Sequence, residues 1–208
     1  MPRTALFVID IQQALALSTT TSIPHASRIL NAGPSILAKV RAAIDTTRSQ
    51  GLNPDLEIVI VQHEETPDKG ALQRGSKEWE LVFPPRANDE YERLASKNVR
   101  TSPLSLMTSL FTPSDCSAGD AFTSNPDLAA DLRSRGVDTI VAFGIQSECC
   151  VLSTCRGALA AGFRVVLLRG AHSTYDAGGK SAGEIERDVE AMLGADGAEV
   201  LEWEEWEP

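Results

Sequence analysis

One stretch of the sequence decides the fold class: residues 139–151, which read TIVAFGIQSECCV. Its first half is a continuous apolar run, the pattern of a strand that is buried on both faces. Gly144 closes that strand, and Val151, Cys155 and Leu159 then recur at helical spacing. A buried strand that leads through a glycine turn into a helix is typical of a βαβ unit in a parallel sheet.

The same alternation of strands and helices extends along the whole chain. Strands are predicted over residues 5–9, 57–61, 91–97, 139–143, 164–168 and 199–201. Helices are predicted from Pro34 to Gly51 and over residues 128–136, 151–162 and 180–193. We therefore expect a single α/β domain over residues 1–208. Its three α/β/α layers would surround a mostly parallel, doubly wound, Rossmann-like sheet of about six strands.

Composition excludes several functional classes. The chain has 208 residues and a formal net charge of -10, and this acid excess argues against nucleic acid or an anionic membrane as a partner. No apolar run approaches the ~18 residues of a membrane span. The four cysteines include no C-x-x-C pair, and adjacent cysteines rarely bridge each other. We expect four free thiols and a reducing, cytoplasmic setting.

The predicted sheet places several polar residues at one edge. Ligands of such sheets bind at the carboxyl ends of the strands. Asp10 ends the first strand, Gln62 and His63 end the second, and residues 144–150 follow the 139–143 strand. We expect these residues to lie together along this edge.

Cys150 is the candidate nucleophile of this edge. The unpaired N–H groups and the dipole at a helix start favour a thiolate and could hold an oxyanion. The alternative is that Cys150 is a small buried apolar residue.

Asp10 and Lys97 are candidates for the accompanying base and cation. A carboxylate at a strand end can accept a proton, and a lysine near a thiol can lower the pKa of that thiol. The alternatives are a loop-capping role for Asp10 and a solvated side chain for Lys97.

Six short segments resemble the isochorismatase-like cysteine hydrolases in their order and spacing. They are LFVIDIQ (6–12), VQHE (61–64), EWEL (78–81), AF (121–122), GIQSECCV (144–151) and RGAHSTYD (169–176). The fifth is the most specific, because it is close to the family pattern G-x-x-[TS]-x-x-C-V. The resemblance covers nearly the whole chain.

The resemblance implies roles for individual residues. Cys150, which directly precedes the valine, would be the nucleophile, Asp10 the base and Lys97 the family's lysine. The family has a cis peptide in the turn, which corresponds to Ile145-Gln146. The backbone N–H groups of Gln146 and Cys150 would then form the oxyanion hole.

The sequence departs from the family in two places. Ala121-Phe122 follows the lysine much later than usual, after a loop insertion at about residues 100–119, so Lys77 and Lys69 stay open as substitutes for Lys97. The histidines of the nicotinamidase metal site are also missing. We therefore expect no metal, no cofactor and no nicotinamidase. The siderophore-type isochorismatases, which lack the cysteine, are also disfavoured.

The function expected from this resemblance is a metal-independent cysteine hydrolase. It would cleave a small-molecule amide or related C–N bond through a thioester, with an Asp10, Lys97 and Cys150 triad. The resemblance also implies a homo-oligomer, a dimer or a tetramer. One alternative is a catalytically silent binding or scaffold protein with the same fold. A nucleotide-binding protein is less supported, since no G-x-G-x-x-G or P-loop motif follows any strand.

Further residues have weaker sequence support. Gln12, His63, Trp79 and Phe122 are candidates for substrate binding, with packing or loop roles as the alternative. We expect His172 to be a turn residue, and Trp203 and Trp206 to pack on the surface or on a partner subunit.

Overall fold

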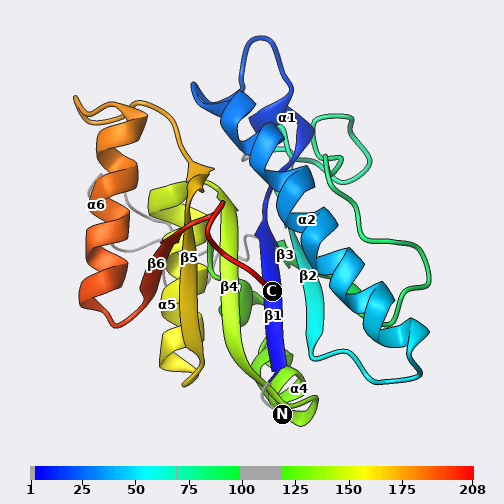
Figure 1. Ribbon diagram of the computed structural model, residues 1–208. Coiled ribbons are helices and arrows are strands. Elements are labelled where there is room, and N and C mark those ends of the chain that lie inside the picture. The colour runs from blue at the N-terminus through cyan, green and yellow to red at the C-terminus, as the bar shows by residue number, and fades with distance from the viewer. Residues whose placement is uncertain (1–2, 69, 99–118) are drawn as a thin grey trace.

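The molecule is built on a sheet of six parallel strands in the order β3-β2-β1-β4-β5-β6 (Figure 1). The structure is a computed structural model that describes residues 3–68, 70–98 and 119–208. Its strands are β1 (Arg3–Ile9), β2 (Leu56–Glu64), β3 (Glu92–Asn98), β4 (Val137–Ile145), β5 (Arg164–Ser173) and β6 (Glu199–Glu202). The predicted three-layer α/β/α fold is confirmed, and every neighbouring strand pair is parallel.

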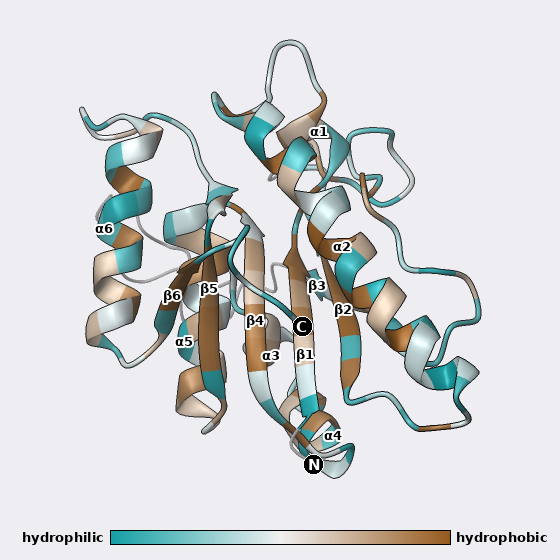
Figure 2. Cartoon of the chain, in the orientation of Figure 1, coloured by the Kyte–Doolittle hydropathy of each residue, from teal (hydrophilic) through white to brown (hydrophobic). Residues whose placement is uncertain are grey.

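Helices cover both faces of the sheet. One face carries α1 (Gln13–Ala16) and α2 (Ala26–Ser49); the other carries α3 (Ala121–Ser124), α4 (Leu128–Ser134), α5 (Leu152–Ala160) and α6 (Ala182–Ala195). Alternate residues of β1 serve the two faces: Leu6 and Val8 pack toward α2, whereas Phe7 and Ile9 pack toward the other layer. The central strands therefore read as continuous apolar runs, between helices with more polar outer sides (Figure 2).

The predicted start of the long helix is wrong. Helix α2 begins at Ala26, and Pro34 lies inside it rather than near its start. Buried Ile29 and Ala32 extend the apolar face toward the N-terminus. Pro34 is exposed, so the carbonyl group that loses its helical partner lies on the solvent side.

The strand order reverses between β1 and β4, which is where doubly wound sheets bind ligands. The two strands approach closely at their carboxyl ends, because Gly144 pairs with Ile9. Gly144 has φ +141°, and a Cβ at this position would lie 2.1 Å from the Ile9 carbonyl oxygen. Only glycine fits there, and the close approach brings Asp10 beside the turn after β4.

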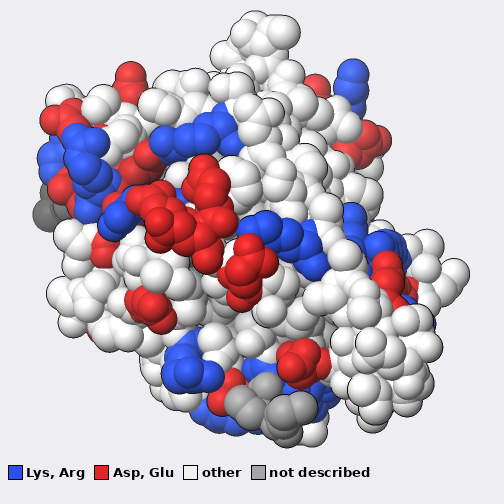
Figure 3. Space-filling view, in the orientation of Figure 1, with Lys and Arg blue, Asp and Glu red and all other residues white. Residues whose placement is uncertain are grey.

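The predicted insertion at residues 100–119 lies outside the described residues except for Gly119. Among the described helices, none is long and apolar enough to span a bilayer. Acidic and basic side chains are interspersed on the face seen in Figure 3. Ion pairs at partly or well exposed positions of the described residues include Arg169–Glu202 and Lys39–Glu207.

Candidate active site

A buried ion pair joins the ends of β1 and β3. Lys97 Nζ lies 2.5 Å from Asp10 Oδ2, and both side chains are closed to solvent. Asp10 adopts φ +49°, a left-handed conformation that Asp tolerates better than most residues. Burial by itself would lower the pKa of Lys97, but the neighbouring Asp10 and Cys150 raise it well above its ordinary value. Lys97 is therefore held as a cation.

Lys97 reaches Asp10 across β2, which separates β1 from β3. It also donates a hydrogen bond of 3.0 Å to the Gly119 carbonyl. Of the two substitutes, Lys77 is exposed and Lys69 lies outside the described residues. Lys97 is thus the lysine that the described part of the structure brings to Asp10.

Cys150 lies on the turn that follows β4. This turn, η3 (Ser147–Val151), is π-helical, and the α-helix α5 starts only at Leu152. Single π turns of this kind are rare in proteins, and those that occur are often found at functional sites. Cys150 is partly buried against the core, and its thiol interacts with both Asp10 and Lys97. The structure therefore brings the three candidate residues together.

The surroundings of Cys150 act against the thiolate that the sequence favours. Burial, and then the negative charge of Asp10, raise the pKa of the Cys150 thiol to about 12, although Lys97 acts in the opposite direction. The helix start and one lysine do not outweigh these two effects. At neutral pH Cys150 therefore keeps its proton, and Lys97 is an ammonium group.

Gly119 and Thr154 also belong to this site, and the sequence did not single them out. The Gly119 carbonyl accepts hydrogen bonds from Lys97 and from Thr154 Oγ1, the latter at 3.3 Å. A Cβ on Gly119 would lie 3.3 Å from the Cys150 Cα. Thr154 is one helical turn beyond Cys150, which is the only sequence signal that could have indicated it.

The peptide bond between Ile145 and Gln146 is cis, the geometry that the family resemblance implies for this bond. Gln146 directly precedes η3 in an extended conformation. Its backbone therefore lies at the start of the turn that carries Cys150.

Gln12 and Phe122, two of the candidates for substrate binding, are engaged in contacts within the protein. The fully buried Gln12 side chain donates to the carbonyls of His63 and Trp79, at 3.0 and 2.8 Å, and accepts from the His63 N–H. It ties the ends of β1 and β2 to the loop before β3. Phe122 lies in the core and stacks on Phe7, with ring centroids 5.8 Å apart.

His63 and Trp79 remain candidates for contact with a substrate. His63 is next to Lys97 in the register between β2 and β3. Burial lowers the pKa of His63, so its ring is neutral at pH 7. Within the described part of the chain, His63 Nδ1 and Trp79 Nε1 are buried and have no hydrogen-bond partner.

His172 and Trp206 differ from their expected roles, whereas the partly buried position of Trp203 does not contradict packing on the surface. His172 is no turn residue: it lies at the end of β5, fully buried, with Nδ1 2.8 Å from Ser147 Oγ. Trp206 is buried in the core beneath α2, and Trp203 is partly buried beside Gly170.

The cysteines also differ from expectation. Cys150 and Cys155 are free, but Cys149 is disulfide-bonded, so the expectation of four free thiols is wrong. Cys116 lies outside the described residues. Within the described ranges, no cluster of three or more His, Cys, Asp or Glu side chains could hold a metal ion.

Comparison with known proteins gives matches over nearly the whole chain. The model of the isochorismatase domain matches residues 4–205. Two streptothricin hydrolases of Streptomyces noursei are each 30% identical, over 176 and 196 residues, or 84% and 94% of this chain. The matches cover 56% and 58% of those proteins, so this chain spans little more than half the length of these relatives.

Solved structures share the fold. A cysteine hydrolase from Pseudomonas syringae pv. phaseolicola superposes with a TM-score of 0.73 at 20% identity, over 98% of this chain and 90% of that one. N-carbamoylsarcosine amidase from Thermoplasma acidophilum superposes with a TM-score of 0.66 at 21% identity, over 99% of both chains.

Proposed function

The chain belongs to the isochorismatase family, and on that premise we propose that it is a cysteine hydrolase acting on an amide or related C–N bond of a small molecule. The observation that carries the proposal is the buried Asp10–Lys97 pair beside the Cys150 thiol. The names of two relatives, streptothricin hydrolase and N-carbamoylsarcosine amidase, agree with hydrolysis of this kind.

In the proposed mechanism, the first half-reaction forms a thioester. Asp10 takes the proton of the Cys150 thiol as the sulfur attacks the substrate carbonyl carbon. The backbone N–H groups of Gln146 and Cys150 hold the resulting oxyanion. Asp10 then gives the proton to the leaving nitrogen, the C–N bond breaks, and an amine or ammonia departs.

The second half-reaction returns the enzyme to its starting state. Asp10 takes a proton from water, and the oxygen of that water attacks the thioester carbonyl. The C–S bond breaks, the carboxylic acid leaves and Cys150 regains its proton. Lys97 keeps a positive charge beside Asp10 and the sulfur throughout both half-reactions.

The raised pKa of Cys150 agrees with this order of events. A thiol that is neutral in the resting site ionises only as it attacks, when the neighbouring carboxylate can take its proton. We propose that His63 and Trp79 contact the substrate, since each has a buried polar atom without a partner among the described residues. The small-molecule substrate and the homo-oligomer stay predictions.

Cys150→Ala tests the proposed function. The variant should lose all turnover of a panel of small amides, carbamates and ureido acids, measured as released ammonia or amine. Cys155→Ala is the matched control: Cys155 is free and fully buried on α5, and it should retain activity. Turnover by Cys150→Ala would contradict the proposal. A wild-type protein that binds small molecules without turning any over would favour the silent binding protein.

A further inference from the structure

His172 is buried directly behind the turn that carries Cys150. Its side chain is closed to solvent, and it pairs in register with Gly144 at the end of β4. Its Nδ1 lies 2.8 Å from Ser147 Oγ. Ser147 is fully buried as well and is the first residue of η3. This contact therefore links the end of β5 to the start of the turn.

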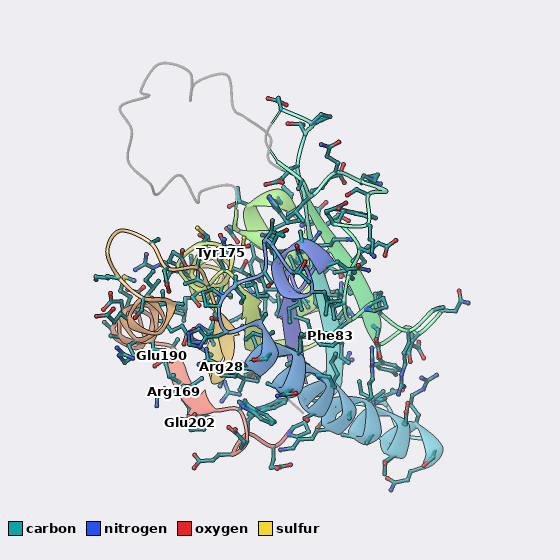
Figure 4. All side chains as sticks on the ribbon, turned by 90° about the horizontal axis from the view of Figure 1, so that it is seen from above. Arg28, Phe83, Arg169, Tyr175, Glu190 and Glu202 are labelled. Carbon is teal, nitrogen blue, oxygen red and sulfur yellow. The ribbon has the colours of Figure 1, made fainter. Side chains whose placement is uncertain are left out.

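The other side of the His172 ring faces an acidic residue. Nε2 lies 3.4 Å from Glu190 Oε1 of α6, and Arg169 donates to the same carboxylate at 2.9 Å. Arg169 also contacts Glu202 of β6 at 3.3 Å, and Figure 4 shows Arg169, Glu190 and Glu202 close together. The contacts thus run from the buried turn to the surface.

Glu190 lies on the Nε2 side of the His172 ring, at a distance longer than a hydrogen bond of good geometry. Burial would raise the pKa of Glu190, but His172 and Arg169 lower it overall, so the carboxylate is ionised at neutral pH. An ionised carboxylate opposite Nε2 favours the proton on that nitrogen. With the proton on Nε2, Nδ1 is an acceptor to which the Ser147 hydroxyl can donate.

The backbone of His172 is held separately. Arg28 donates to the His172 carbonyl at 3.0 Å and pairs with Glu186 at 2.7 Å. Glu186 in turn accepts from Ser173 Oγ at 2.5 Å. These contacts involve the His172 backbone and Ser173 rather than the His172 ring, so they are separate from the contact with Ser147.

We propose that His172 is a positioning residue for the nucleophile: through Ser147 it holds the π turn so that Cys150 stays against Asp10 and Lys97. The inference rests on the proposed function. His172 touches neither the substrate nor the sulfur; it acts on the first residue of the turn. A buried polar contact at this point fixes one backbone arrangement, because a shifted turn would leave Ser147 and His172 unpaired.

Two substitutions of His172 separate its two contacts. In His172→Asn, the amide oxygen stands where Nδ1 stood and can still accept from Ser147. In His172→Gln, the amide reaches the place of Nε2 and loses the Ser147 contact. Ser147→Ala removes the same contact from the other side. Ser173→Ala is the matched control, because it removes a neighbouring buried hydroxyl that bonds Glu186 instead.

The expected result is a split between these variants. His172→Gln and Ser147→Ala should lower kcat about 100-fold with little change in KM, the size of loss that a small misplacement of a reacting group produces. The double variant should be no worse than either single one. His172→Asn and Ser173→Ala should keep most of kcat. Equal losses in Ser147→Ala and Ser173→Ala, or full kcat in His172→Gln, would overturn the proposal.

A second readout needs no substrate and separates this proposal from the proposed function. The rate at which iodoacetamide alkylates Cys150 in the folded protein reports the surroundings of the sulfur. It should differ between Ser147→Ala and Ser173→Ala while thermal unfolding shows both variants folded. Identical rates would overturn the positioning role, whatever the wild-type protein does with amides. If the wild-type protein turns over no amide but the alkylation rates of Ser147→Ala and Ser173→Ala differ clearly, only the proposed function is overturned.

Discussion

Lys97 Nζ lies 2.5 Å from Asp10 Oδ2, and neither side chain reaches solvent. The pair spans the carboxyl ends of β1 and β3, which are not adjacent in the sheet. Two buried opposite charges at this distance depend on each other, because either one alone would be desolvated and uncompensated. The folded state therefore tolerates neither charge without the other.

Lys97→Met should destabilise the protein by about 3–5 kcal/mol, since it leaves Asp10 buried without its partner. Adding Asp10→Asn should recover most of that loss, because the remaining charge is then removed. Urea unfolding of the two single variants and the double variant at pH 7 measures the coupling. The exposed pair Lys180–Asp188 is the control, and Lys180→Met should hardly change the stability. A Lys97→Met variant as stable as this control would contradict the prediction.

The free thiols of Cys150 and Cys155 should make the fold sensitive to alkali. The pKa values of Cys150 and Cys155 are each raised to about 12, chiefly by burial, whereas an unfolded thiol titrates near ~8.5. The folded state thus keeps protons that the unfolded state loses. Their contribution to stability is complete below about pH 8.5 and falls as the pH rises toward 12.

For the fully buried Cys155 the loss should be about 2 kcal/mol between about pH 9 and pH 10.5. The free energy of unfolding in urea, measured at both pH values, gives the slope. Cys155→Ala lowers stability at neutral pH by leaving a small cavity, but its alkaline slope should be shallower. An unchanged slope in this variant would show that Cys155 does not titrate in that range.

The strands and the place of Cys150, the proposed nucleophile, were predictable from local sequence. The apolar runs before Asp10 and Gly144 are long enough to identify buried strands, and parallel strands bring their carboxyl ends to one edge. Cys150 follows from its place after such a strand. These features need only a few neighbouring residues, so the sequence pattern is sufficient for them.

Burial by distant segments was not predictable. Lys97 stands in a polar stretch and looks solvated, yet Asp10 and Gly119 enclose it from other elements. The high pKa of Cys150 also comes from burial. Local sequence does not show which residues will be desolvated, so this pKa was not predictable. The sequence made Phe122 a candidate for the substrate pocket, because it does not show that Phe7, far away in the chain, stacks on the Phe122 ring.

Phe122→Ala should act on stability rather than on substrate affinity. The ring stacks on Phe7 and packs on Phe163, with centroid distances of 5.8 and 5.9 Å. Its removal should cost about 3–5 kcal/mol by leaving a cavity in the core. Thermal unfolding measures this loss, and steady-state kinetics below the unfolding range should show a nearly unchanged KM. A large rise in KM at unchanged stability would return Phe122 to the substrate site.

Gly144→Ala should be among the most damaging small substitutions in the chain. The added Cβ would lie 2.1 Å from the Ile9 carbonyl oxygen, which is backbone and cannot rotate away, at a φ of +141°. Gly51→Ala is the matched control, because Gly51 also has positive φ, +74°, but a Cβ there meets nothing within 4 Å.

Gly51→Ala should cost about 1–2 kcal/mol, the strain of a left-handed alanine alone. Gly144→Ala should exceed about 4 kcal/mol, because the strand ends must separate and Asp10 moves with them. Thermal unfolding of the soluble fractions compares the two variants. Where Gly144→Ala stays folded, the alkylation rate of Cys150 should also change, since Asp10 no longer lies where the thiol meets it. Equal melting temperatures for the two variants would contradict this prediction, because they would mean that the strand ends separate at little cost. Some contact other than the close approach of β1 and β4 would then hold Asp10 beside the turn.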